Sequence, residues 1–145
     1  KNIRDWLHVS DHCRAIEFVL KKGALGQIYN ISGCNELANI HLVQMLLAEI
    51  KTLLKRHPAL SNITKVDPDR IGKDLITFVK DRPGHDRRYS IDATKIRKEL
   101  GWQPLVDFRE GLKMTIKWYL DNQNWLHTVT GGGFENYYRR MYANR

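Results

Sequence analysis

The strongest constraint on the fold is a run of apolar residues at helical spacing between residues 40 and 54. Apolar side chains that recur at every third or fourth position lie on one face of a helix. The set is Ile40, Val43, Leu46, Leu47, Ile50, Leu53 and Leu54. Asn39 precedes the run, where a helix N-cap is expected. The pattern predicts a long amphipathic helix that buries one face against the rest of the chain.

An earlier helix is predicted over residues 11–22, between a candidate N-cap at Ser10 and a terminating glycine at Gly23. Its basic last turn would lie at the negative end of the helix dipole. One apolar face would pack into the core, formed by Cys13, Ile16, Val19 and Leu20.

Later in the chain, Asp92 is placed to cap a short helix over 93–100 that stops at Gly101. A capping-box pattern opens a longer helix over 107–122. A last short amphipathic helix is predicted over 134–142, after a glycine-rich turn.

Strands are predicted where β-branched and aromatic residues gather, over 3–9, 27–33 and 75–80. The proline- and glycine-punctuated stretch 57–73 is predicted to be a loop. The order of elements describes a mixed α/β chain. Its strands are too few and too short for a sheet of their own, so we expect some of them to complete a sheet built elsewhere.

Composition bounds the class of protein. A chain of 145 residues with 42% hydrophobic residues is expected to form a single domain, 1–145. The start of the chain does not resemble a signal peptide, and no apolar run approaches the length of a membrane helix, so a cytoplasmic protein without a membrane partner is expected. Cys13 and Cys34 lack paired spacing, which favours reduced thiols over a disulfide; no histidine or cysteine pattern predicts a metal site.

The formal net charge of +8 favours an anionic partner. The basic residues are spread over the whole chain, and no DNA- or RNA-binding module is recognisable, so nucleic acid is not the expected partner. A phosphate-bearing small molecule would need only a few of these charges. A basic interaction module for nucleic acid or an acidic protein remains the alternative class.

The segment "DRPGH", residues 81–85, is the sharpest local motif. Pro83 fixes its own backbone and favours an extended Arg82, and Gly84 permits a positive φ, so the segment is a stiff corner. Arg82 and His85 could grip a phosphate there. The alternative is a surface ion-pair cluster of little energetic value. For Arg4, which is next to Asp5, two interpretations also remain: a salt bridge or a contact with a bound anion.

Several segments together resemble one family: "IRDWLHVSDHCRAI", "GQIYNISGCNELANI", "ITFVKDRPGHDRRYSIDATKIRKELGWQP" and "FREGLKMTIKWYLDN". They are similar to the C-terminal, substrate-binding part of the dTDP-glucose 4,6-dehydratases, within the extended short-chain dehydrogenases/reductases. The resemblance implies a mixed α/β nucleotide-sugar-binding portion without the N-terminal Rossmann core. It also implies substrate-binding roles, which carry over to Arg4, Asn39, Asp81, Arg82, Pro83, Gly84 and His85.

The family's chemistry converts dTDP-glucose to dTDP-4-keto-6-deoxyglucose and water with bound NAD. It needs a glycine-rich dinucleotide fingerprint, a Tyr-x-x-x-Lys pair and an adjacent Asp-Glu pair, and the sequence contains none of them. We therefore expect no catalytic residue in these 145 residues and no turnover by them alone. NAD is expected only in a full-length enzyme. The expected partners are a dTDP-sugar, or a UDP- or GDP-sugar as the alternative, and the missing Rossmann domain. Self-association through exposed apolar surface is a further expectation.

Overall fold

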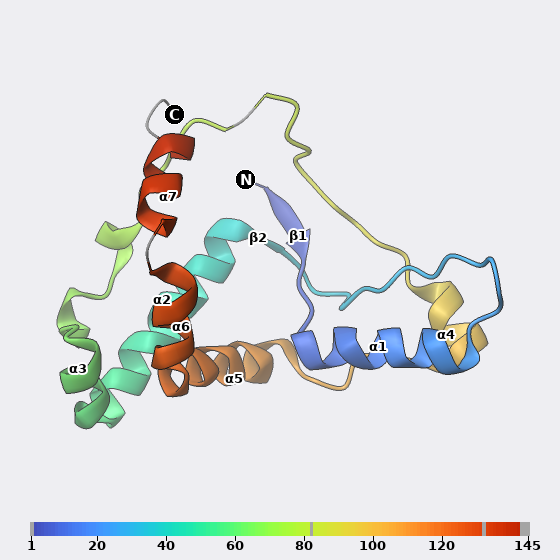
Figure 1. The fold of residues 1–145 in the computed structure, drawn as a ribbon, viewed down its shortest axis with the longest axis horizontal. Coiled ribbons are helices and arrows are strands. Elements are labelled where there is room, and N and C mark those ends of the chain that lie inside the picture. The colour runs from blue at the N-terminus through green and yellow to red at the C-terminus, as the bar shows by residue number, and fades with distance from the viewer. Residues whose placement is uncertain (1, 82, 132, 143–145) are drawn as a thin grey trace. The chain divides into compact units, whose positions relative to one another are not determined.

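The computed structural model describes residues 2–81, 83–131 and 133–142. The chain divides into two compact units. The first comprises residues 1–46 and 86–113, and the second comprises residues 47–85 and 114–145. Helices α2 (Asn39–Arg56) and α5 (Phe108–Asp121) each begin in the first unit and end in the second. Figure 1 shows the order of the elements along the chain.

A small sheet anchors the first unit. Strand β1 (Ile3–Asp5) pairs antiparallel with β2 (Glu36–Ala38), with Arg4 opposite Leu37. A parallel bridge joins Ile3 to Arg88 on the segment that leads towards α4. The described residues are thus mostly helical with a two-stranded sheet, which agrees with the predicted mixed α/β class.

The core of the first unit lies between α1 (Val9–Lys22) and α4 (Thr94–Leu100), which lie side by side in Figure 1. Its fully buried members are Ala15, Ala93, Ile96, Leu100 and Trp102. Burying each large apolar side chain contributes about 1.5–3 kcal/mol relative to exposure. Trp102, 1% exposed, is the largest of them and closes the end of α4.

A buried carboxylate ties α1 to the loop before α5. Asp11 is fully buried and accepts hydrogen bonds from the backbone N–H groups of Leu105 and Val106, at 3.0 and 2.9 Å. Arg14, one turn along α1, forms an ion pair with Asp11 at 2.9 Å. The charge is therefore compensated from two directions, as burial of a carboxylate requires.

The second unit is built on the C-terminal part of α2. Among the residues of this unit whose burial is described, the buried apolar ones are Leu54, Ile71 and Ile116. The stretch after α2 forms helix α3 (Pro58–Thr64) and two short 3-10 turns, Pro68–Arg70 and Lys73–Leu75. Lys55 of α2 holds the first of these turns through an ion pair with Asp69, at 2.7 Å.

Helices α6 (Gln123–Thr130) and α7 (Phe134–Tyr142) are the last elements of the described residues. The α7 bounds agree with the prediction, and α6 is an addition to it. Trp118 of α5 packs edge-on against Trp125 of α6, with ring centroids 5.0 Å apart. Among the described residues, none of the helices has the length and apolarity needed to cross a bilayer.

Two of the predicted strands are wrong. Residues 27–33 and 76–80 take no regular secondary structure, and Ile28 and Phe78 are 81% and 83% exposed. A strand needs a neighbour to accept and donate its backbone hydrogen bonds. The actual partner of β1 is β2, residues 36–38, which lies just before the predicted helix cap at Asn39 and for which no strand was predicted. The predicted strand over 3–9 is confined to residues 3–5.

The predicted loop 57–73 is also wrong, since it contains α3 and a 3-10 turn. Pro58 stands in the first turn of α3, where its missing N–H costs nothing, so it starts a helix and does not break one.

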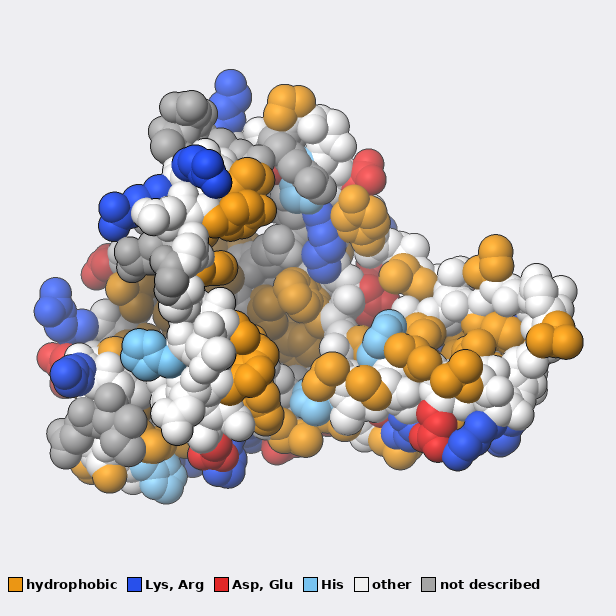
Figure 2. All heavy atoms as spheres, in the orientation of Figure 1, with side chains coloured by type: hydrophobic (Ala, Val, Ile, Leu, Met, Phe, Trp, Pro, Cys, Tyr) orange, Lys and Arg blue, Asp and Glu red, His pale blue; other side chains and the backbone are white. Residues whose placement is uncertain are grey.

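The predicted orientation of α1 is wrong in part. Ala15 and partly buried Phe18 and Val19 face the core, whereas Ile16 and Leu20 are 45% and 81% exposed. The N-cap is His8, whose ring nitrogen accepts from the Ser10 backbone N–H, so Ser10 lies inside the first turn. The outer apolar residues form a stripe along α1, consisting of Val9, Cys13, Ile16 and Leu20. Figure 2 shows hydrophobic side chains gathered over this part of the molecule.

Candidate functional site

The small sheet brings two of the predicted binding residues onto neighbouring segments. Arg4 is the central residue of β1, and Asn39 follows β2 directly as the first residue of α2. The Asn39 backbone N–H donates to the carbonyl of Asn2, at 2.9 Å, which continues the pairing of the strands by one step. Asn39 is exposed and Arg4 is half-buried.

The Arg4 guanidinium is held on its edge and on its face. Its Nη1 donates to the Ile3 carbonyl at 2.6 Å, and its Nη2 donates to the Asp86 carbonyl at 3.2 Å. The guanidinium also lies over the Tyr89 ring, with its carbon 4.3 Å from the ring centroid. A guanidinium presents five donors in a rigid fork that matches phosphate oxygens. This one is positioned before any ligand binds.

Asp5, which could have paired with Arg4, bonds to the turn before β2. One of its carboxylate oxygens accepts from the Asn35 backbone N–H at 2.9 Å, and the other accepts from the Ser32 hydroxyl. The Asn35 side chain in turn donates to the carbonyls of Trp6 and Gly33. These bonds fix the turn to β1, so the backbone under Arg4 is rigid.

The turn also carries a strained residue. Cys34 has φ of 56°, in the left-handed region that non-glycine residues rarely adopt. Its thiol accepts from Arg97 Nη2 at 2.8 Å. Cys13 and Cys34 are both free thiols.

The "DRPGH" corner lies in the second unit, with Arg82 outside the described residues. Asp81 Oδ1 and His85 Nδ1 lie 2.7 Å apart and close the corner across its two ends. Gly84 has φ of 69°, which is the positive value that the motif predicts and that favours glycine. Pro83 and Gly84 are exposed at the tip. The corner is therefore confirmed as a turn, and the binding roles of Asp81 to His85 stay a prediction.

Arg88 has a structural partner. Its Nε and Nη2 donate to one Glu36 oxygen at 2.9 and 2.5 Å, and the Ser90 hydroxyl donates to the other at 2.5 Å. The hydrogen bond from Ser90, followed by the one from Arg88, lowers the pKa of Glu36 below its ordinary value of 4.5. Glu36 thus attaches the segment 88–90 to β2.

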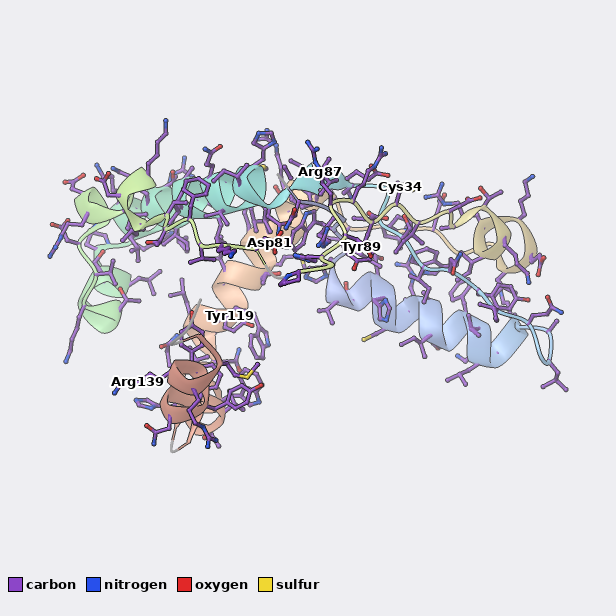
Figure 3. The ribbon with its side chains drawn as sticks, turned by 90° about the horizontal axis from the view of Figure 1, so that it is seen from above. Cys34, Asp81, Arg87, Tyr89, Tyr119 and Arg139 are labelled. Atoms are coloured by element: carbon purple, nitrogen blue, oxygen red, sulfur yellow. The ribbon has the colours of Figure 1, made fainter. Side chains whose placement is uncertain are left out.

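Sequence reasoning missed Glu36 and Tyr89 as parts of this arrangement. Tyr89 lies 85 positions beyond Arg4 in the chain, and no local spacing rule predicts a contact of that range. Figure 3 shows Arg87 and Tyr89 on the same extended segment. The signal that could have drawn attention to it is the dense run of charges around residues 86–88.

The model of a known protein family, described as GDP-mannose 4,6 dehydratase, matches residues 1–115 of the chain. The chain belongs to this family.

The curated proteins most relevant to this chain share a more specific name, dTDP-glucose 4,6-dehydratase. The chain is 48% identical over 132 residues to a dTDP-glucose 4,6-dehydratase of Neisseria meningitidis serogroup B, covering 91% of this chain and 35% of the relative. It is 40% identical over 143 residues to one from Escherichia coli, covering 99% of this chain and 36% of the relative. The predicted resemblance is confirmed. The chain spans about a third of the length of these relatives.

A solved structure extends the comparison to the fold. The dTDP-glucose 4,6-dehydratase of Bacillus anthracis, in complex with NAD, superposes with a TM-score of 0.64 at 42% identity. The match covers 86% of this chain and 33% of that one. The described part of this dehydratase-family chain therefore shares its fold with one portion of an NAD-bound relative.

Proposed function

We propose that this chain is the nucleotide-sugar-binding part of a dTDP-glucose 4,6-dehydratase, an enzyme that converts dTDP-glucose to dTDP-4-keto-6-deoxyglucose and water. The observation that carries the proposal is the identity of 40–48% to relatives of that name over 91–99% of the chain. We further propose that both compact units belong to one substrate-binding part.

The geometry around Arg4 supports this role. A nucleotide sugar carries a diphosphate, and a guanidinium whose edge and face are already held loses little freedom when it binds one. Asn39 directly follows β2, the strand that pairs with β1, and would add an uncharged amide to the site. We assign the second set of contacts to the corner Asp81 to His85, where Arg82 would supply a further positive charge.

NAD, the dinucleotide cofactor, would bind outside this chain. The 145 residues of the chain contain no glycine-rich dinucleotide fingerprint and no Tyr-x-x-x-Lys pair. They therefore do not suit NAD or the hydride chemistry that NAD supplies when bound. The residues of this chain would bind and orient the sugar nucleotide, and the reacting groups would come from the remaining two thirds of the protein.

The outer stripe of α1 supports a packing partner of that kind. Val9, Ile16 and Leu20 are 67%, 45% and 81% exposed along one side of the helix. Exposed apolar rows of this type mark surfaces that another domain covers. We propose that the Rossmann domain, which this chain lacks, covers this stripe, and that the chain self-associates when the stripe is left uncovered.

The two cysteines bear on the location of the protein. Cys13 and Cys34 are free thiols, which fits the reducing cytoplasm, and we propose that the protein is cytoplasmic.

Nucleotide binding can be tested by NMR, which detects millimolar affinities. Resonances of the isotopically labelled chain should shift with dTDP and dTDP-glucose, more weakly with UDP and GDP, and should not respond to a single-stranded oligonucleotide. Shifts with the oligonucleotide and none with dTDP would overturn the proposal in favour of a basic interaction module. Stronger binding of GDP than dTDP would point to a GDP-sugar substrate.

A matched pair of variants separates a specific contact from general charge. Arg4→Ala should weaken dTDP binding about tenfold or more, because it removes a charge-assisted bidentate donor. Arg109→Ala removes an exposed positive charge from the first turn of α5 and should leave the affinity unchanged. Equal weakening by both variants would show that only net charge matters.

A further inference from the structure

The Tyr89 ring is placed against Arg4 by the backbone on either side of it. The Ile3 N–H donates to the Arg87 carbonyl at 2.8 Å, and the Tyr89 N–H donates to the Ile3 carbonyl at 3.2 Å. These two bonds attach residues 87–89 to β1 in the manner of a short parallel strand. Tyr89 is therefore fixed beside the residue that follows Ile3, which is Arg4.

A second anchor holds the same segment from the other side. Glu36 of β2 accepts from both Arg88 and Ser90, the two neighbours of Tyr89 in the chain. The segment around Tyr89 is thus bonded to β1 through its backbone and to β2 through the side chains of Arg88 and Ser90, which leaves the ring little freedom to move away from the guanidinium. Tyr89 itself is 40% exposed, so burial in a core does not account for its position.

The Tyr89 ring holds the guanidinium without a hydrogen-bond acceptor of its own, because a tyrosine ring attracts a cation to its face through its quadrupole. The carbonyls of Ile3, Asp86 and Arg87 accept from the two Nη groups, at 2.6, 3.2 and 3.5 Å. We propose that Tyr89 is a positioning residue that holds Arg4 ready for the diphosphate of a nucleotide. This inference rests on the proposed function.

The stacking can be tested without any nucleotide. Side-chain Hδ protons of Arg4 that lie over an aromatic face are shifted upfield in the NMR spectrum. We expect the shift in the wild-type chain and in Tyr89→Phe, which keeps the ring, and its loss in Tyr89→Leu. Unchanged Arg4 resonances in Tyr89→Leu would overturn the proposed positioning role and leave the proposed function intact.

The functional consequence is tested by titrating dTDP into the same variants. Tyr89→Leu should weaken binding about threefold to tenfold, the range expected for loss of one cation–π contact, and Tyr89→Phe should restore it. Tyr137→Leu, an exposed tyrosine on α7, serves as the control and should bind as the wild type does. Wild-type affinity in Tyr89→Leu, or equal weakening in Tyr89→Phe, would overturn the inference. Absence of dTDP binding by the wild type would overturn the proposed function and this inference with it.

Discussion

Replacing Asp11 by Asn tests whether the first unit depends on its buried carboxylate. The substitution keeps the size and shape of the side chain and removes its charge. In the structure the carboxylate accepts from the N–H groups of Leu105 and Val106 and pairs with Arg14. The Leu105 N–H contacts both carboxylate oxygens, at 3.0 and 3.1 Å, so an amide oxygen in the Oδ2 position would still accept from both N–H groups. The amide NH2 would then take the Oδ1 position, where Arg14 and the Leu105 N–H are also donors.

The expected loss follows from these contacts. A hydrogen bond to a charged acceptor contributes about 1.5–3 kcal/mol against about 0.5–1.5 kcal/mol for a neutral one, and a buried NH2 group that faces other donors costs about 1–3 kcal/mol. Arg14 is 27% exposed and can be hydrated after its partner is lost, so it adds little. We therefore expect Asp11→Asn to lower the free energy of unfolding by about 3 kcal/mol.

Urea unfolding followed by tryptophan fluorescence measures this loss, because Trp102 is buried in the same unit. The midpoint should fall by about 1–3 M with an unchanged m-value. Glu17→Gln, which removes an exposed ion pair on the same helix, is the control and should not shift the midpoint. A loss below about 1 kcal/mol for Asp11→Asn would refute the reasoning, since it would equal the loss of an ordinary neutral hydrogen bond.

Three further outcomes follow from single contacts. The pKa of Glu36 is lowered in the folded chain, chiefly by the Ser90 hydrogen bond, so its contribution to stability is present above pH 4.5 and is lost as the pH falls through the folded pKa. Glu36→Gln should therefore melt below the wild type at neutral pH and match it well below pH 4.5; a gap that stays constant with pH would contradict this. Gly101 ends α4 with φ of 71° and open space around it, so Gly101→Ala should cost about 1 kcal/mol in urea unfolding, from backbone conformation alone, and an unchanged midpoint would disprove the cap. Phe78 is 83% exposed, so Phe78→Ser should leave stability unchanged and reduce self-association in sedimentation experiments; unfolding of the variant would show that the ring is packed.

Local signals in the sequence predicted helices well because their ends are chemically marked. Gly23 and Gly101 each end a helix as expected, and α2 begins at Asn39. Asp107 caps α5 by accepting from the N–H groups of Arg109 and Glu110. Each of these signals acts within a few residues, so no tertiary contact is needed to recognise it.

Strands and faces were predicted less well because they depend on partners distant in the chain. Residues 75–80 have high β-propensity, yet propensity alone supplies no neighbouring strand. α1 is apolar on more than one side, and periodicity could not tell that Ala15 faces the core while Ile16 and Leu20 face outwards.

The candidate site shows the same division. Arg4 and Asn39 were proposed from a family motif, and the sheet register places them on adjacent segments. The stacking of Tyr89 on Arg4 and the attachment of residues 88–90 to Glu36 could not be read from the sequence, because the contacts join segments more than 50 positions apart.

The most direct test of the central claim is the affinity for dTDP of the wild-type chain, Arg82→Ala and Arg70→Ala. Arg82 belongs to the "DRPGH" corner, and Arg70 is an exposed arginine of the same unit, so the two variants remove equal charge. We predict that dTDP binds the wild type and Arg70→Ala equally, and that Arg82→Ala weakens binding about tenfold or more. Equal affinity in all three proteins, or binding in none of them, would contradict the assignment of this chain as a nucleotide-sugar-binding part.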